Sequence, residues 1–307
     1  GLGVIGISEA LARLNPDALI ALGDRFETFA AVVAAYVARV PVVHLYGGET
    51  TEGAFDEGFR HSITKMSCLH FTSTESYRSR VIQLGEPPET VFNVGALGID
   101  NVKSVGLLSK EELEKSLACS FGPRCALVTF HPVTLEDNSA AEQFKNLLEA
   151  LETHDDLNII FTKPNADTGG RIIIAMIDEF VKKRPERFFA YTSLGQRNYL
   201  SAVSHVDVVV GNSSSGIVEV PSLGKPTVNI GDRQKGRIRA ASVIDYKPER
   251  DAINDALVRA LSAAHLALCG KVVNPYGDGN SAGKIHDILK SRMGDLDIKK
   301  GFHDIKF

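Results

Sequence analysis

Short apolar runs alternate with helix-like stretches along most of the chain. In the first hundred residues the apolar runs predict strands over 18–22, 42–46, 70–72 and 91–94. The alternation restarts further on and predicts strands over 125–130, 157–162, 188–191, 206–210 and 227–230. Strands that alternate with helices are typical of a parallel sheet covered on both faces. The pattern therefore predicts an α/β protein built from two Rossmann-like, doubly wound domains.

The two series of strands are separated by a polar, helical stretch over 101–123 that contains KEELEKSL. We therefore expect a first domain over 1–101, a second over 102–285, and a C-terminal helix and tail over 286–307. The first domain shows about four strands, fewer than a doubly wound domain usually has. We expect that its N-terminal part, including a first strand and loop, is absent from this sequence.

Composition narrows the class of protein. A length of 307 residues suits two domains, and 44% hydrophobic with 23% charged residues is typical of a globular enzyme. The net charge of −4 and the lack of a Lys/Arg run argue against a nucleic-acid partner. Because no apolar run reaches eighteen residues, we expect no membrane span. The four cysteines form no C-x-x-C pair and no zinc-spaced cluster, which favours a reduced, cytoplasmic protein without a structural metal.

The stretch GNSSSGIVEVPSLGKP follows a buried strand and leads into a predicted helix. Hydroxyls and backbone N–H groups at a helix N-terminus bind anions, above all phosphate. An acid one turn further along the helix can accept hydrogen bonds from ribose hydroxyls. A single Asn or Ser would suggest only a helix cap, but this cluster favours a ligand. The candidate residues are Asn212, Ser213, Ser214, Ser215, Gly216 and Glu219.

Acidic residues follow strands of the first domain. They are Asp24 in LGDRFE, Glu49 in YGGETTEG, and Asp56 and Glu57 in FDEGFRH. Doubly wound sheets place reactive groups at strand carboxyl ends, so we expect these carboxylates to share one cleft. Close carboxylates raise one another's pKa, which prepares one as acid and one as base. For Asp24 or Asp56 alone, a helix-capping role is about equally expected.

Other candidates lie in loops of the second domain. His131 follows a predicted strand, although a lone histidine is more often structural than catalytic. Lys163, Asn165 and Asp167 sit in a strand-end loop, where they can meet a substrate or only shape a turn. The basic loop 233–237, which ends at Arg237, suits a diphosphate or a nucleotide base but also suits solvated surface.

Several familiar motifs are missing. The sequence has no G-x-x-x-x-G-K-[ST], no G-x-G-x-x-G and no nucleophile elbow, which argues against ATPase, dinucleotide-binding and serine-hydrolase functions. We expect no metal and no cofactor. His44 and His70 lie within apolar strands, and we predict that both are buried, hydrogen-bonded core residues.

Six longer motifs carry a family resemblance. They are LGDRFE at 22–27, HLYGGETTEGAFDEGFRHSITK at 44–65, LHFTSTESYRSRVIQLGE at 69–86, FNVGALGID at 92–100, TFHPVT at 129–134 and VVVGNSSSGIVEVPSLGKPTVNIGDRQKGR at 208–237. Together they resemble the hydrolysing UDP-N-acetylglucosamine 2-epimerases of sialic-acid synthesis. The resemblance implies a glycosyltransferase-B type fold, an active site between the domains, a UDP-sugar partner and a homo-oligomer.

The resemblance also implies a reaction. UDP-N-acetylglucosamine would lose UDP by elimination across C1–C2 through a 2-acetamidoglucal, and water would add to give N-acetylmannosamine. By similarity, Asp24, Glu49 and Glu57 fall on the acidic active-site positions and His131 on the cleft histidine. Ser213, Ser214, Gly216 and Glu219 fall on the UDP-binding loop, and Arg237 on the basic loop. Residues 212–216 are called the serine loop below. Which carboxylate is acid and which is base stays open.

Three alternatives remain at this stage. A relative that hydrolyses UDP-2,4-diacetamido-2,4,6-trideoxyglucose would differ only in the pocket around sugar C4 and C6. A nucleotide-sugar glycosyltransferase would share the second domain but has no need of three acids at strand ends of the first. A non-catalytic UDP-binding protein is suggested by the short first domain.

Overall fold

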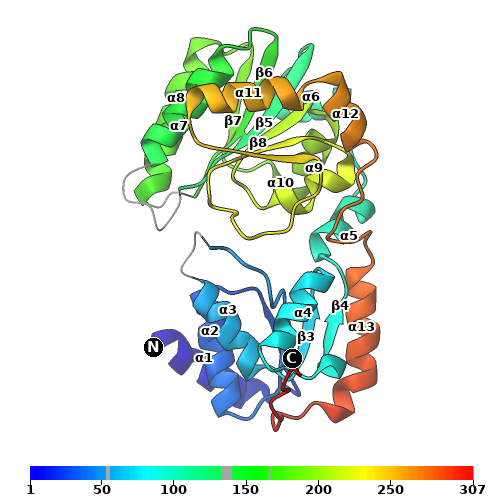
Figure 1. Ribbon diagram of the computed structural model, residues 1–307. Coiled ribbons are helices and arrows are strands. Elements are labelled where there is room, and N and C mark those ends of the chain that lie inside the picture. Colours follow the sequence, from blue (N-terminus) through cyan, green and yellow to red (C-terminus); the bar gives the residue numbers. More distant parts are fainter. Residues whose placement is uncertain (53–55, 133–139, 166–167, 307) are drawn as a thin grey trace. The chain divides into compact units, whose positions relative to one another are not determined.

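The computed structural model describes residues 1–52, 56–132, 140–165 and 168–306, and the chain divides into two compact units. Of the described residues, the first unit contains Gly1–Thr51, residues 56–100 and the segment from Tyr276 onwards. The second contains Glu52 and Asn101–Pro275. Each unit is built on one parallel sheet (Figure 1), which confirms the predicted α/β class with two doubly wound halves.

The first unit has a four-stranded sheet in the order β1-β2-β3-β4. Its strands are β1 Leu19–Leu22, β2 Val42–Leu45, β3 Leu69–Thr72 and β4 Val91–Asn93. The helices before and between them are α1 Leu2–Leu14, α2 Phe26–Val37, α3 Glu57–Met66 and α4 Glu75–Gln83, with the single turn η1 Pro88–Thr90. They are followed by α5 Leu97–Ser104 and, from the end of the chain, α13 Ser281–Arg292 and the turn η3 Met293–Asp295.

The two central strands of this sheet, β2 and β3, are buried along their whole length. Val42 packs in a cluster with Leu11 of α1 and Val32 of α2. Its neighbour Val43 points to the other face, where the cluster includes Ile285 of α13. Strands buried on both faces read as continuous apolar runs rather than alternating ones, which is why β2 and β3 were visible in the sequence.

The second unit has a six-stranded parallel sheet in the order β10-β9-β8-β5-β6-β7. Its strands are β5 Arg124–Thr129, β6 Leu157–Thr162, β7 Phe188–Tyr191, β8 Val208–Gly211, β9 Thr227–Ile230 and β10 Val243–Tyr246. Its helices are α6 Lys110–Leu117, α7 Ala140–Glu152, α8 Thr168–Lys183, α9 Gly195–His205, α10 Ser215–Val218, α11 Arg250–Ala260 and α12 Ala263–Cys269, with the turn η2 Val220–Leu223. The helices α7, α8 and α11 contribute to the core on one face of the sheet, and α6 and α9 to the core on the other.

The strand order reverses at β5, which pairs with β6 on one side and β8 on the other. In open parallel sheets this switch point opens a crevice at the strand carboxyl ends, where ligands bind. The register pairs Thr129 with Gly211, so the residues that follow both strands meet at this point.

Three details differ from the sequence-based expectation. The strand β10 and the helices α11 and α12 were not predicted. The segment from Tyr276 belongs to the first unit, whereas residues up to 285 were expected in the second domain and 286–307 as a separate tail. The helix expected to carry Glu219 is one turn long and ends at Val218, because Pro221 lies directly beyond it and the chain continues as a 3-10 turn.

Within the described part of the chain, no single helix is both long and apolar enough to cross a membrane; only α11 and α12, joined at a sharp bend, reach that length and composition together.

Candidate functional site

A buried arginine organises the acidic residues of the first unit. Arg60 lies on α3 and is only 2% exposed. Its Nη2 atom forms an ion pair with Asp24, which follows β1, and donates a hydrogen bond of 2.8 Å to Thr51 Oγ1. Its Nη1 atom lies 3.7 Å from Glu57 Oε2. The structure therefore brings Asp24 and Glu57 together through a shared cation.

Glu57 is held as a carboxylate. The backbone N–H of Thr51 donates to Glu57 Oε2 over 2.9 Å, and His61 Nε2 lies 3.2 Å from Oε1. Burial alone would raise the pKa of Glu57, but the bonds from His61 and Thr51 and the charge of Arg60 outweigh it and lower that pKa. An ionised carboxylate of this kind can accept a proton but has none to donate.

Asp56, the preceding residue, has the opposite tendency. Burial and then the negative charge of Asp24 raise the pKa of Asp56. Its side chain makes no capping bond to α3, so the helix-capping alternative does not account for it. The surroundings of the two neighbours Asp56 and Glu57 thus displace their pKa values in opposite directions.

Glu49 is fixed by a tight turn. It is 6% exposed, and Ser73 Oγ donates a hydrogen bond of 2.8 Å to its Oε1 atom. The preceding Gly48 has a φ of 76°, and a Cβ atom there would lie 2.3 Å from the carbonyl oxygen of Tyr77. Both the positive φ and this contact exclude a side chain at Gly48, so the turn that presents Glu49 requires glycine there.

In the second unit, Asn212 ties the end of β8 to the end of β5. Its Oδ1 atom accepts from the backbone N–H of His131 over 2.7 Å, and its Nδ2 atom donates to the carbonyl of His131 over 2.8 Å. Gly211 permits this approach, since a Cβ atom there would lie 1.9 Å from the carbonyl oxygen of Thr129. The Asn212 side chain is therefore occupied by the backbone of His131.

The peptide between Asn212 and Ser213 is fixed by two further donors. Arg233 Nη1 and Gln234 Nε2 each donate to the carbonyl oxygen of Asn212 over 3.0 Å. Because the peptide is planar and trans, fixing this carbonyl also fixes the direction of the Ser213 N–H group. Gly216 packs closely on Thr227, whose hydroxyl donates to its carbonyl over 2.7 Å. The serine loop is a rigid turn of backbone at a strand end.

Positive charge is concentrated beside this loop. Burial, and then the positive charge of nearby Arg237, lower the pKa of Arg233. An arginine stays protonated despite such a shift. Two guanidinium groups therefore sit close together near the serine loop, an arrangement that an anion would stabilise.

Glu219 follows α10 as its C-terminal cap. The carbonyl of the preceding Val218 accepts a hydrogen bond of 2.8 Å from Asn274 Nδ2. Burial, together with the charge of Glu219, raises the pKa of Tyr199 to about 12. Although α10 is shorter than expected, it places Glu219 one turn beyond Ser215, as the sequence predicted.

Comparison with known proteins assigns the chain to a family. A family model described as UDP-N-acetylglucosamine 2-epimerase matches residues 1–290. The chain belongs to this family. The resemblance inferred from the six motifs is thereby confirmed.

Two curated relatives show how much of a family member the chain represents. Polysialic acid biosynthesis protein P7 of Escherichia coli is 43% identical, over 94% of this chain and 74% of that protein. The GDP/UDP-N,N'-diacetylbacillosamine 2-epimerase (hydrolyzing) of Campylobacter jejuni is 41% identical, over 80% of this chain but only 64% of that protein. The matched region thus covers roughly two thirds to three quarters of these relatives.

A solved structure agrees in fold. The UDP-GlcNAc 2-epimerase from Neisseria meningitidis, determined with bound UDP-GlcNAc, matches with a TM-score of 0.82 at 19% identity, over 94% of this chain and 80% of that one. This likeness confirms the glycosyltransferase-B type fold.

Other site residues predicted for this epimerase-family chain lie in the loop after β6 or outside the described residues. Lys163 Nζ lies 2.6 Å from Asp178 Oδ1 on α8, so its charge is paired within the second unit. Asn165 is exposed in the loop after β6. The residues Val133, Thr134 and Asp167, which were considered with these loops, lie outside the described residues.

The predicted structural role of two histidines is confirmed. His44 is fully buried, with Nδ1 3.1 Å from Thr64 Oγ1 and Nε2 3.0 Å from the carbonyl oxygen of Gly23. Burial lowers the pKa of His44 to about 3, so it is neutral at physiological pH. His70 is also fully buried, with Nε2 3.1 Å from Glu86 Oε2.

Sequence reasoning missed the central role of Arg60. It was visible only as one charged residue of a predicted helix, and its spacing of three from Glu57 was the available signal. In the described part of the chain, no three His, Cys, Asp or Glu side chains gather as a metal site would require.

Proposed function

We propose that the protein is a hydrolysing 2-epimerase that converts UDP-N-acetylglucosamine to N-acetylmannosamine and UDP. The observation that carries this proposal is the acidic array of the first unit, in which Asp24 and Glu57 share the buried Arg60. A protein that only binds UDP, or transfers its sugar, needs an anion loop but no such array. Family membership supports the same class of reaction.

The residues divide the reaction between them. We assign the removal of the C2 proton to a carboxylate base, and Glu57, which its partners hold in the ionised form, is our candidate for that step. As the C2–H bond breaks, the C1–C2 double bond of 2-acetamidoglucal forms and the C1–O bond to UDP breaks. Water then adds its oxygen to C1 and returns a proton to C2. We assign Asp56, the neighbour of Glu57, to substrate binding.

We assign the remaining groups around these steps. Glu49 is the second carboxylate at the sugar, and Asp24, held by Arg60, positions groups or handles protons. We assign the serine loop, His131 and Arg237 to the diphosphate and Glu219 to the ribose. Donors and cations at the diphosphate stabilise the negative charge that develops on departing UDP. Of the remaining candidates, Lys163 and Asn165 are weaker, since Lys163 is already paired with Asp178.

A second substrate is favoured by one specific observation. The Campylobacter jejuni relative, 41% identical, is described as a GDP/UDP-N,N'-diacetylbacillosamine 2-epimerase (hydrolyzing). The alternative proposal is therefore hydrolysis of UDP-2,4-diacetamido-2,4,6-trideoxyglucose by the same steps. Family resemblance also supports proposals that the protein acts in the cytoplasm and as a homo-oligomer.

The test is to incubate the protein with each UDP-sugar in deuterated water. We expect release of UDP and of a free 2-acetamido sugar that carries deuterium at C2, because the proton removed from C2 is replaced from solvent. The UDP-sugar with the higher kcat/KM identifies the substrate. Transfer of the sugar to an acceptor with its C2 proton retained, or UDP binding without turnover, would contradict the proposal.

A further inference from the structure

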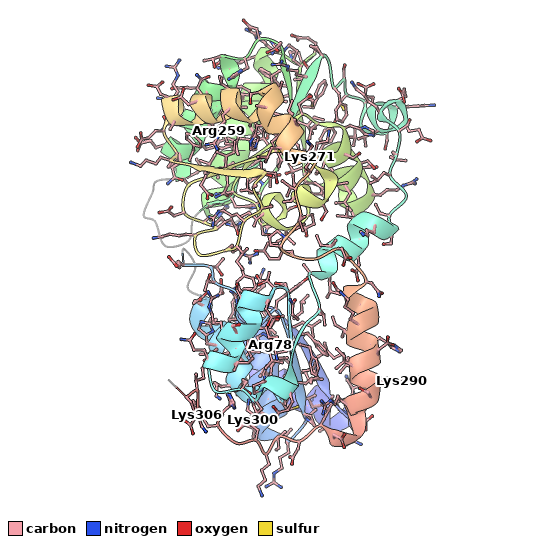
Figure 2. The ribbon with its side chains drawn as sticks, turned by 45° about the vertical axis from the view of Figure 1, so that its right-hand side comes forward. Arg78, Arg259, Lys271, Lys290, Lys300 and Lys306 are labelled. Carbon is pink, nitrogen blue, oxygen red and sulfur yellow. The ribbon has the colours of Figure 1, made fainter. Side chains whose placement is uncertain are left out.

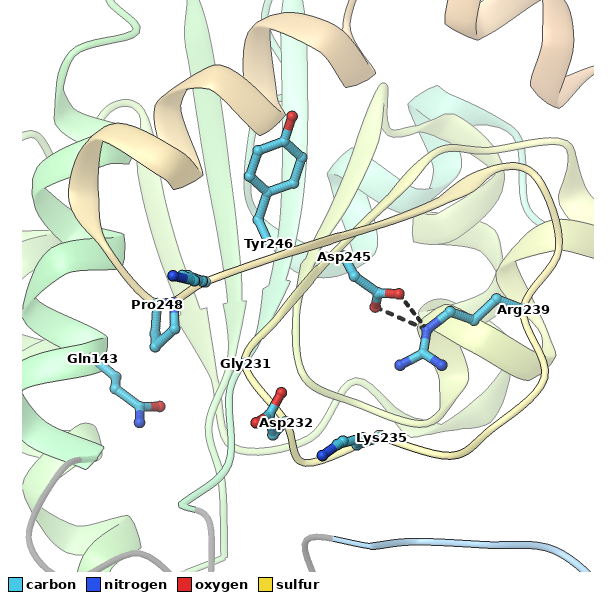
Figure 3. Close-up of a pocket in the computed structure, with 9 residues that line it drawn as sticks. Gln143, Gly231, Asp232, Lys235, Arg239, Asp245, Tyr246 and Pro248 are labelled. Atoms are coloured by element: carbon cyan, nitrogen blue, oxygen red, sulfur yellow. Dashed lines mark hydrogen bonds and ion pairs between the residues drawn. The ribbon is translucent and has the colours of Figure 1, made fainter.

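Arg239 uses its whole guanidinium group inside the second unit. Its Nε atom lies 2.8 Å and 2.6 Å from the two carboxylate oxygens of Asp245, as Figure 3 shows. Its Nη1 atom donates to the carbonyl of Arg237 over 2.6 Å, and its Nη2 atom donates to the carbonyl of Gln234 over 3.1 Å. One planar side chain therefore fixes a strand carboxylate and two carbonyls of the basic loop at once.

Asp245, the carboxylate that Arg239 binds, has a fixed position because it lies in the sheet. Asp245 lies on β10, and its Oδ1 atom also accepts a hydrogen bond of 2.7 Å from Asn229 Nδ2 on β9. Asn229 and Asp245 are partners in the parallel register of these two strands. The position of the Arg239 fork is thus set by two adjacent strands.

The loop that Arg239 holds carries the cations of the candidate diphosphate site. Arg233 and Gln234 reach back to the carbonyl of Asn212, and the charge of Arg237 acts on Arg233. Like charges so close repel one another, and the loop has no strand or helix hydrogen bonds to resist that repulsion. The bonds from Arg239 to the Gln234 and Arg237 carbonyls oppose it.

We propose that Arg239 and Asp245 are positioning residues that hold Arg233 and Arg237 in place for the diphosphate of a bound nucleotide. The proposal rests on the proposed function, and it assigns to this ion pair an effect on UDP affinity without contact to UDP. Both residues line a cavity of about 520 Å³ together with Gly231 and Lys235. Substitution at either position therefore leaves the apolar core of the unit intact.

The test compares UDP with uridine by calorimetry in the variants R239A, R239K and D245N. We expect each variant to weaken UDP binding about tenfold or more, and uridine binding less than about twofold, because only UDP needs the arginines. Lysine should not restore UDP affinity, since a point charge cannot bind Asp245 and two carbonyls as the planar fork does. The matched control is R184A, which removes an exposed arginine paired with Asp155 in the same unit and should bind both ligands normally.

Amide hydrogen exchange of residues 232–237 gives a readout that needs no ligand. We expect faster exchange in R239A and R239K and unchanged exchange in R184A. Full UDP affinity in R239K, equal losses of UDP and uridine, or unchanged loop exchange would each overturn the positioning role. If the unsubstituted protein binds no UDP, the proposed function fails, and the exchange rates still decide whether Arg239 holds the loop.

Discussion

At the scale of single residues, the acidic site depends on one buried cation. Arg60 is almost completely buried and pairs with Asp24 and Glu57, both of which are partly exposed. Removing one partner from such a cluster leaves the others desolvated without compensation, typically a loss of about 3–5 kcal/mol. The cluster is therefore a structural unit as well as a candidate catalytic one.

Substitution of Arg60 should reveal both roles. We expect R60M to lower the free energy of unfolding by about 3 kcal/mol and to reduce turnover at least about a hundredfold. R60K should recover part of the stability but little activity, because lysine cannot bridge Thr51, Asp24 and Glu57 as a fork. Urea denaturation and UDP-release kinetics measure the two effects, with R13M, at an exposed position of helix α1, as the control. An active R60M enzyme would exclude a role for the cluster in catalysis.

A substitution at Glu49 separates binding from chemistry. Gln at this position can still accept the hydrogen bond of 2.8 Å from Ser73, so the turn should keep its structure. We expect E49Q to bind UDP within about tenfold of normal affinity while turnover is abolished, because the proposed UDP-binding residues belong to the second unit. Calorimetry with UDP and a UDP-release assay measure the two quantities. Loss of UDP binding in this variant would contradict the assigned role.

The residue scale is also where sequence reasoning reached its limit. The acids were identified because each follows a strand, and strand ends converge in this type of fold. Asn212 was expected to bind a ligand, but its side chain binds the backbone of His131, which lies 81 positions earlier in the chain. A local sequence pattern cannot show a hydrogen-bond partner that lies so far away along the chain.

At the scale of elements, the junction between β8 and α10 depends on glycine. Gly211 has a φ of 133°, and a Cβ atom there would overlap the carbonyl of Thr129 at 1.9 Å. Both the backbone conformation and the contact exclude a side chain without a shift of β5 or β8. The serine loop can form only because this strand end stays in register with its neighbour.

We therefore expect G211A to destabilise the second unit by about 3 kcal/mol or more, and to weaken UDP binding at temperatures where the unit is still folded. Chemical denaturation and calorimetry are the measurements. The control is G106A, since nothing lies within 4 Å of a Cβ atom at Gly106 and its φ is ordinary. Equal stability of the two variants would show that the loop tolerates an altered strand end.

The strand β8, at the centre of the second sheet, was predicted from its sequence, whereas β10, at one edge of that sheet, was not. The strand β8 is buried along its whole length, and its apolar run was recognised. By contrast, β10 is an edge strand with the exposed residue Asp245 in its sequence VIDY, so it lacks a continuous apolar run. Burial on both faces imposes an apolar sequence, and edge positions do not.

At the scale of the whole chain, the C-terminal segment returns to the unit in which the chain began. Asp100 accepts hydrogen bonds from the backbone N–H groups of Ser281 and Ala282 over 2.9 Å and 2.7 Å, which caps the start of α13. Ile285 of that helix packs against the first sheet, and α13 is the orange-red helix beside β4 in Figure 1. An amphipathic helix shows in its sequence that one face is buried, but not which sheet it covers.

Beyond α13, the C-terminal segment that returns to the first unit is held by an ion pair between Lys300 and the buried Glu86. Lys300, labelled in Figure 2, donates over 2.5 Å to Glu86 Oε2 and over 2.6 Å to the carbonyl of Ser67. Glu86 is fully buried and also binds Lys65 and His70. Burial opposes its ionisation, but these three partners prevail and lower the pKa of Glu86 to about 2.

This cluster sets a pH dependence of stability that can be measured. An unfolded Glu86 would titrate near 4.5, so its stabilising contribution is complete above that pH and is lost as pH falls from 4.5 through about 2. Burial lowers the pKa of His70, so protonation of this histidine in the unfolded chain below about pH 6.5 also reduces stability as the pH falls.

We expect K300M to reduce the stability of the first unit by about 1–3 kcal/mol at pH 7, and to flatten the decline of stability below pH 4.5, because Glu86 then has one partner fewer. Stability measured from pH 2.5 to 7 for K300M and for the exposed neighbour K299M tests both effects. Coincident stability profiles for the two variants would mean that Lys300 does not stabilise the returning segment.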